Sequence, residues 1–258
     1  MIFQWLANRR RKKLRQRPFP EAWRGYIEKN VQAYGHLTPQ EQAKLQDDIQ
    51  VFIAEKNWEG CGGLVLTDEM KATIAAQACL LVLAFENEYF DRVLSILVYP
   101  SAYVAPGQSI TRAGVVTEGD SHREGEAWYR GPVILSWADA LSGGQRSGDG
   151  SNLVIHEFAH QLDMLNGRDV DGMPPLPTAD RVKQWREVVD KEFAQLEDDC
   201  RHRRRPLLDC YGTTNLAEFF AVASECFFER SREMSKRHPE LYGIMRDYYG
   251  QDPASRTP

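Results

Sequence analysis

The sequence lacks a long apolar run, and this absence excludes a membrane-spanning helix. A span needs about 18 to 20 consecutive apolar residues, whereas the longest apolar stretch, residues 75–85, is shorter and is interrupted by Gln77. The order that marks a secretion signal is also missing, because the apolar residues 1–7 precede the positive charges. We therefore expect a cytoplasmic protein.

The chain is also poor in cysteine, and no CxxC pair occurs. An odd number of widely spaced cysteines, without a secretion signal, favours reduced thiols over a disulfide framework. We therefore expect all five thiols to be free. They are Cys61, Cys79, Cys200, Cys210 and Cys226.

A large excess of one charge is missing too. The net charge is −5, so bulk electrostatics give no reason to expect nucleic-acid binding. The first seventeen residues nevertheless hold seven cations and no acidic residue, which leaves −12 on the remainder. Such an arm can bind nucleic acid, an acidic membrane surface or an acidic patch of the same protein. We favour a solvated helical arm that packs on its own acidic body, and we expect no direct nucleic-acid binding. The cations are Arg9, Arg10, Arg11, Lys12, Lys13, Arg15 and Arg17.

The remaining pattern is that of an ordinary globular domain, with 42% hydrophobic and 27% charged residues. Thr38, Pro39 and Glu41 illustrate a clear helix start, with a capping threonine and a glutamate three residues later. Periodicity predicts helices over 21–34, 38–56, 67–84, 149–165, 180–200, 215–233 and 238–249. Strands are expected over 93–99 and 131–137, with weaker candidates at 114–118 and 127–129.

These elements predict a helix-rich α+β fold with one small sheet. We expect a single catalytic domain over residues 18–250. The basic arm, residues 1–17, precedes it, and a disordered tail, residues 251–258, follows it. A second basic run at 201–205 follows acidic residues and indicates a polar connection between two helices.

One short motif carries the chemistry. His156, Glu157 and His160 form an HExxH pattern inside a predicted helix. Two histidines four residues apart lie one turn above each other on the same face, where a tetrahedral Zn²⁺ can bind both. The glutamate between them is the usual general base of a metallopeptidase. The motif therefore predicts a zinc hydrolase.

The surroundings of the motif predict a buried helix. Ser151 or Asn152 could cap its N-terminus, and Gly167 is placed to end it. The alternative is a helix whose histidines only hydrogen-bond within the core, because buried polar groups need partners and a metal is one way to supply them.

The third zinc ligand is less certain from the sequence. Asp163 shares the face of the histidines but lies about 4.5 Å beyond His160 along the axis, which favours an outer or structural role. Glu218, in the first turn of a later helix, can approach from the side. Asn215 and Glu218 also spell a capping box, so ligand and cap are about equally supported. Glu225 shares the face of Glu218 and is a candidate to orient a ligand.

At this point the sequence resembles a known family. The motif at 156–160, followed by Tyr-Gly-x-Thr-Asn-x-x-Glu-Phe-Phe-Ala at 211–221, is similar to the Mlc titration factor A family of bacterial zinc peptidases. Residues 131–137 and 224–229 resemble that family too, and the likeness covers residues 18–250. The motif region alone is similar to the catalytic domain of anthrax lethal factor.

The resemblance implies a zincin-like metallopeptidase with one Zn²⁺ per chain. It implies that His156, His160 and Glu218 are the zinc ligands, which breaks the tie over Glu218. It also implies that Glu157 is the base and that the phenol of Tyr211 stabilises the oxyanion.

Two functions follow as expectations. The first is a zinc-dependent peptidase that cleaves a peptide or protein, with amino-terminal trimming implied by the resemblance. The strand residues Val133, Ile134 and Leu135 would pair with an extended substrate. The second, also implied by the resemblance, is binding of the transcription repressor Mlc, which would regulate sugar uptake through the glucose phosphotransferase system. The alternative is a non-catalytic protein that sequesters the repressor and keeps only a structural or vestigial zinc site.

Overall fold

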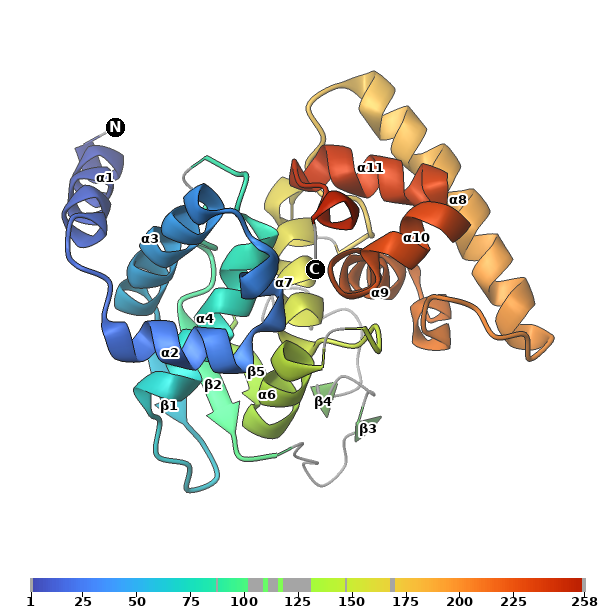
Figure 1. The fold of residues 1–258 in the computed structure, drawn as a ribbon. Coiled ribbons are helices and arrows are strands. Elements are labelled where there is room, and N and C mark those ends of the chain that lie inside the picture. The colour runs from blue at the N-terminus through green and yellow to red at the C-terminus, as the bar shows by residue number, and fades with distance from the viewer. Residues whose placement is uncertain are drawn as a thin grey trace.

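Helices make up most of the molecule, and a small parallel sheet lies at one side of it, away from the C-terminal helices (Figure 1). The computed structural model describes residues 2–86, 88–101, 109–110, 116–117, 131–146, 148–167 and 170–256. Its α-helices are α1 (Ile2–Arg15), α2 (Glu21–Asn30), α3 (Pro39–Glu55), α4 (Asp68–Leu81), α6 (Trp137–Gln145), α7 (Leu153–Asp163), α8 (Ala179–Arg201), α9 (Leu216–Glu229), α10 (Ser231–Arg237) and α11 (Pro239–Tyr249). Short 3-10 turns are η1 (Gln32–His36), η2 (Met164–Asn166), η3 (Cys210–Thr213) and η4 (Pro253–Ser255). The prediction of a helix-rich α+β protein is confirmed.

The sheet contains β1 (Asn57–Gly60), β2 (Ser95–Tyr99) and β5 (Val133–Ser136), in the order β1-β2-β5 and all parallel. The central strand β2 buries every second residue, as expected for a strand with one face on the core. The strands predicted at 93–99 and 131–137 are therefore present but shorter.

Other parts of the β structure differ from the prediction. Strand β1 was not expected, because its four residues lack an apolar alternation and are half-buried at best. A separate two-stranded ribbon pairs β3 (Ser109–Ile110) with β4 (Val116–Thr117), which lies inside the weak candidate at 114–118. The candidate at 127–129 lies outside the described residues.

Local capping explains where several helices begin. The Thr38 hydroxyl accepts a hydrogen bond from the Glu41 amide, and the Glu41 carboxylate accepts one from the Thr38 amide, so the predicted capping box is formed at α3. The Asn152 side chain accepts from the Ile155 amide at 3.0 Å and caps α7. This cap starts α7 four residues later than predicted.

One hydrophobic core extends through the molecule and includes buried residues of α3, α4, α7, α8, α9 and α11. Residues 72–81 of α4 are all buried, as expected for a central helix. On α7, Phe158 is fully buried, and its ring centroid lies 5.6 Å from that of Phe52 and 4.7 Å from that of Phe90. These edge-to-face contacts fix one side of α7 against the core. Its opposite side is left to face α9.

Two helix predictions need correction. The helix expected at 215–233 ends at Glu229, and α10 begins at Ser231 after Arg230 leaves helical geometry. Helix α6 was not predicted. It begins at Trp137, which was assigned to the strand, because the Ser136 hydroxyl accepts from the Asp139 amide and caps a helix there.

The prediction of five free thiols is wrong for two of them. Cys200 and Cys210 form a disulfide, with a Cα–Cα distance of 5.8 Å. Helix α8 ends at Arg201, and Arg203 adopts φ 55°, so the chain turns back and η3 returns to the end of α8. Cysteine spacing alone does not reveal this return. The other three cysteines are free.

Both chain ends pack on the body. Arg11 of α1 forms ion pairs with Glu55 and Asp91, so the basic arm is a helix held against α3, as we favoured from the sequence. At the other end, Arg256 donates to Glu41 Oε1 at 2.7 Å and Gln251 donates to the Leu80 carbonyl at 2.8 Å. The prediction of a disordered tail is therefore wrong for residues 251–256. No helix in the described part of the chain is long and apolar enough to cross a membrane.

Candidate metal centre

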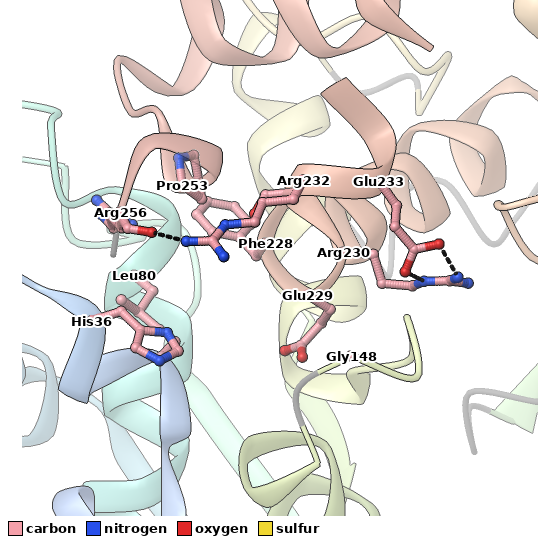
Figure 2. Close-up of a pocket in the computed structure, with 12 residues that line it drawn as sticks. His36, Leu80, Gly148, Phe228, Glu229, Arg230, Arg232, Glu233, Pro253 and Arg256 are labelled. Carbon is pink, nitrogen blue, oxygen red and sulfur yellow. Dashed lines mark hydrogen bonds and ion pairs between the residues drawn. The ribbon is translucent and has the colours of Figure 1, made fainter. Parts of the chain in front are cut away.

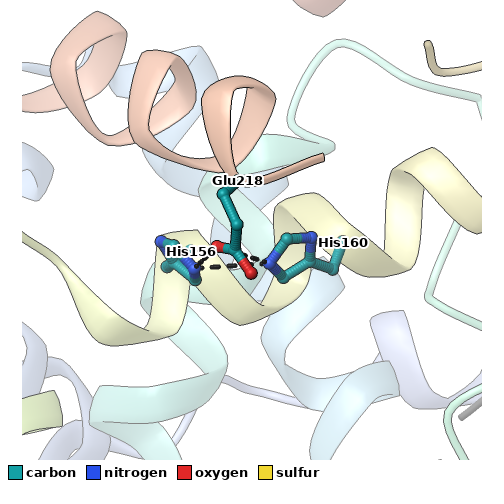
Figure 3. A group of neighbouring side chains, drawn as sticks. All are labelled: His156, His160 and Glu218. Atoms are coloured by element: carbon teal, nitrogen blue, oxygen red, sulfur yellow. Dashed lines mark hydrogen bonds and ion pairs between the residues drawn. The ribbon is translucent and has the colours of Figure 1, made fainter. Parts of the chain in front are cut away.

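The side chains that the motif singled out meet where α7 packs against α9 (Figure 3). His156 and His160 point from successive turns of α7 toward the same space, and Glu218 reaches that space from the first turn of α9. Asn215 caps α9 by accepting from the Glu218 amide at 2.9 Å. The Glu218 carboxylate does not complete the capping box but turns toward the histidines.

The three side chains form a compact triangle of potential ligand atoms. The His156 Nε2 atom lies 3.3 Å from His160 Nε2 and 3.0 Å from Glu218 Oε2. His160 Nε2 lies 3.5 Å from the same oxygen. A tetrahedral zinc with bonds of about 2.0–2.1 Å holds its ligand atoms about 3.3 Å apart. The donor set and its spacing therefore fit one Zn²⁺.

Glu225 holds the first histidine in place. Its Oε1 lies 2.7 Å from His156 Nδ1, and its Oε2 accepts from the Asn152 amide at 2.6 Å. Both oxygens of one buried carboxylate are therefore occupied, one by the His156 ring and one by the start of α7. A carboxylate on Nδ1 leaves Nε2 as the atom that faces the cluster.

The charges of the cluster are strongly coupled. Burial lowers the pKa of His156, but hydrogen bonds to Glu218 and Glu225 outweigh it and raise that pKa to about 10. Burial raises the pKa of Glu218, yet hydrogen bonds from His156 and His160 bring it well below its usual value. Without a metal, His156 is thus a cation between two carboxylates. A bound Zn²⁺ would replace that positive charge.

Glu157 lies beside the cluster and is itself buried. Burial raises its pKa to about 8; the charge of His156 opposes this shift, and Glu218 and Glu225 add to it. Its Oε1 atom has no hydrogen-bond partner among the described residues. A buried carboxyl group with a pKa near neutrality and an uncommitted oxygen is suited to exchange a proton.

Tyr211 lies on η3, next to the disulfide-bonded Cys210. The centroid of its ring is 6.0 Å from that of His156, and its amide donates to Asp209 Oδ1 at 2.9 Å. A cavity of about 310 Å³ adjoins both rings, and three further carboxyl groups line it, those of Asp139, Asp149 and Asp209. No sequence pattern reveals this acidic lining, because its members come from three separate segments.

Two other predicted groups lie away from the triangle. Asp163 is fully buried, and its Oδ2 accepts from the Gly172 amide at 2.8 Å, so it holds the loop that follows α7. Burial raises its pKa to about 6. Of the strand residues, Val133 and Leu135 point into the core and Ile134 is half-buried. Strand β5 pairs only with β2 among the described strands, so it lies at the edge of the sheet near α7.

A second cavity, of about 250 Å³, has a different lining and lies beside α10 (Figure 2). Arg230 pairs with Glu233 at 2.7 Å, and Arg232 donates to the Arg256 carbonyl at 2.9 Å. The cations that line this cavity therefore already have partners. Glu229 extends toward the cavity from the end of α9.

Comparison with known proteins gives one consistent result. The model of the family described as "Glucose-regulated metallo-peptidase M90" matches residues 5–250. An uncharacterized protein of Synechocystis sp. is 39% identical over 245 residues, which is 95% of this chain and 89% of that protein. Mlc titration factor A of Serratia proteamaculans is 35% identical, with 85% and 84% covered. Mlc titration factor A of Salmonella agona is 34% identical, with 86% and 83% covered.

Proposed function

This chain belongs to the glucose-regulated metallo-peptidase M90 family, as its motifs predicted, and we propose that it is a zinc-dependent peptidase. His156, His160 and Glu218 are the proposed zinc ligands. The observation that carries this proposal is the triangle of two imidazole nitrogens and one carboxylate oxygen, whose sides of 3.0 to 3.5 Å match a tetrahedral zinc.

A bound Zn²⁺ would polarise the scissile carbonyl and lower the pKa of a water molecule at the site. Glu157, in its ionised form, would take a proton from a water molecule with its uncommitted oxygen while that water attacks the scissile carbonyl, and would pass the proton to the amine as the C–N bond breaks. Tyr211, whose ring lies beside His156, donates its phenol proton in a hydrogen bond to the oxyanion. Glu225 keeps the His156 ring oriented during these steps.

We propose amino-terminal trimming as the mode of cleavage. The acidic cavity beside His156 and Tyr211 supports it, because carboxylates such as Asp149 and Asp209 favour a positively charged α-amino group there. The outer edge of β5, which pairs with no other described strand than β2, would pair with the backbone of an extended peptide that leads into the site.

The second proposed activity is binding of the transcription repressor Mlc. It is supported by relatives named Mlc titration factor A that are about 35% identical over most of the chain. Such binding would regulate sugar uptake and would place the protein in the cytoplasm. If this chain has no peptidase activity, it would act only by sequestering the repressor, and the zinc would be structural.

Three variants test the peptidase. Wild type should hold about one zinc per chain by elemental analysis, and Glu218→Ala should lose it. Glu157→Gln should keep the zinc but lower kcat about 10²- to 10⁴-fold on an aminoacyl reporter substrate, because the base is lost. Glu240→Gln is the matched control, since Glu240 is exposed and, within the described ranges, forms an ion pair with Lys191 alone. Full turnover by Glu157→Gln would contradict the mechanism.

A pull-down separates the two activities. Immobilised Mlc should retain Glu157→Gln as well as wild type if repressor binding needs no catalysis. If zinc-free wild type still binds Mlc and the zinc-loaded protein has no peptidase activity, only the binding function would be supported.

A further inference from the structure

Helix α1 carries an exposed face that the metal centre does not use. It lies at the outer edge of the molecule, packed against α3 (Figure 1). Leu14 and Arg11 turn toward the body and are 9% and 6% exposed. On the other side, Trp5 and Leu6 are 59% and 49% exposed. Large exposed apolar side chains that lie next to each other and beside a cluster of charges indicate an interaction site.

The same face is strongly basic. Arg9, Lys12 and Lys13 are exposed on it, and the guanidinium of Arg9 lies 5.5 Å from the centroid of the Trp5 ring. Within the described part of the chain, α1 forms ion pairs with the body only through Arg11. Arg9, Lys12 and Lys13 therefore form no ion pair with the described part of the body. An apolar end followed by unpaired cations is typical of helices that lie in a membrane interface.

We propose that α1 docks this protein on the surface of an anionic lipid bilayer. Trp5 and Leu6 enter the headgroup region, and Arg9, Lys12 and Lys13 face the lipid phosphates. The arm has seven cations while the rest of the chain carries −12, so the arm is the part that such a surface attracts. The proposal is independent of the metal centre.

The apolar residues distinguish a bilayer from nucleic acid. Only five large hydrophobic side chains of the described residues are clearly exposed, and two of them are neighbours on α1. A phosphate backbone would engage the cations but would leave Leu6 in water. A bilayer accommodates both groups, because its headgroup layer is charged and its acyl boundary is apolar.

Because α1 is attached to the body, binding of α1 to a bilayer would hold the whole domain at that surface. Arg11 donates two hydrogen bonds to the Glu55 carboxylate from Nε, both at 3.1 Å, and a third from Nη2 at 2.7 Å. Arg10 donates to the Ala54 carbonyl at 3.2 Å. These contacts use the side of the helix that faces away from Trp5. The outward residues can therefore bind lipid while α1 stays on α3.

Sedimentation of the full chain with vesicles tests the proposal. The protein should bind vesicles of phosphatidylcholine mixed with phosphatidylglycerol, should not bind pure phosphatidylcholine, and should dissociate as salt is raised. The triple variant Arg9→Gln, Lys12→Gln, Lys13→Gln should weaken binding on the order of 100-fold, at about fivefold for each cation. The double variant Trp5→Ala, Leu6→Ala should weaken it on the order of tenfold.

A matched control removes the same charge elsewhere. The triple variant Arg201→Gln, Arg203→Gln, Arg205→Gln changes three exposed cations at the end of α8 and in the loop that follows it, and should leave vesicle binding unchanged. Circular dichroism would check that every variant is folded. An equal loss in this control would overturn the proposal, as would equal binding to both kinds of vesicle. Binding to duplex DNA without binding to anionic vesicles would overturn it in favour of nucleic acid.

Discussion

Charged side chains are buried and paired at the α7–α9 contact, but several are exposed and unpaired within the described chain on helix α1. At the contact, His156 and Glu225 are buried, and each polar atom of their side chains has a partner within 3.0 Å. On α1, Arg9, Lys12 and Lys13 are exposed and form no ion pair with the rest of the described chain.

This difference separates charges that the fold requires from charges that it does not. A buried charge without a partner costs several kcal/mol, so the groups at the contact hold one another in a fixed geometry. An exposed charge costs little and contributes little to stability. It stays available to a partner outside the chain. Three predictions test the difference between the α7–α9 contact and helix α1.

The largest effect should come from the apolar support of α7. Phe158→Ala removes a fully buried ring that packs against Phe52 and Phe90, and should lower the free energy of unfolding by about 3–5 kcal/mol. Leu6→Ala on α1 should change it by less than about 0.5 kcal/mol, because Leu6 is already exposed. Urea denaturation would measure both. Similar losses of the free energy of unfolding in the two variants would contradict the predicted difference between the two regions.

Glu225→Gln should have the next largest effect. The amide replaces one of the two acceptor oxygens with an NH2 donor, so either the Asn152 amide or the His156 ring loses its acceptor and faces a donor. We expect zinc affinity to fall about 10- to 100-fold, as for other partners of ligand histidines. Competition with a chromogenic chelator would measure this, with the exposed Glu240→Gln as the control. Unchanged affinity would mean that Glu225 does not hold the ring.

Glu229 is one of the groups at the contact with a polar atom that is unpartnered within the described chain, and its replacement should give the smallest effect. Its Oε1 accepts from Asn152 at 3.1 Å, while Oε2 has no partner among the described residues. Burial raises its pKa to about 8; the Asn152 hydrogen bond opposes this, and Asp149 and Glu225 add to it. Its contribution to stability is therefore full below about pH 4.5 and is lost as pH rises toward 8.

Glu229→Gln should remove this loss. The variant should match wild type near pH 5 and exceed its stability by about 2 kcal/mol near pH 8 to 9. Chemical denaturation at a series of pH values would show the two curves separating. Parallel curves would mean that Glu229 ionises normally.

Much of the fold was predictable because its signals are local. The Thr38 capping box and the HExxH helix depend on residues within one or two turns, and the structure contains both. Strand β1 was not predictable in this way. Its residues become a strand only by pairing with β2, almost forty residues later. The Cys200–Cys210 bond has the same origin, because it depends on where the chain returns after α8.

The site shows the same division. The two histidines were placed from their spacing, since a helix fixes their relation. The sequence pattern supported two roles of Glu218 about equally, as part of a helix cap and as a metal ligand. The structure explains why both roles had support. The amide of Glu218 is the partner of the Asn215 cap, while its carboxylate faces the histidines. The acidic lining from Asp149 and Asp209 comes from separate loops, so no local pattern could reveal it.

The disulfide also determines what a protease could do to this molecule. The segment between the two bonded cysteines begins with residues 201–205, of which four are arginines. All four arginines are exposed. A trypsin-like enzyme that cuts there would divide the chain into two pieces. One would carry His156 and His160, and the other Tyr211 and Glu218. The pieces would still run as one band on a denaturing gel until a reductant separated them.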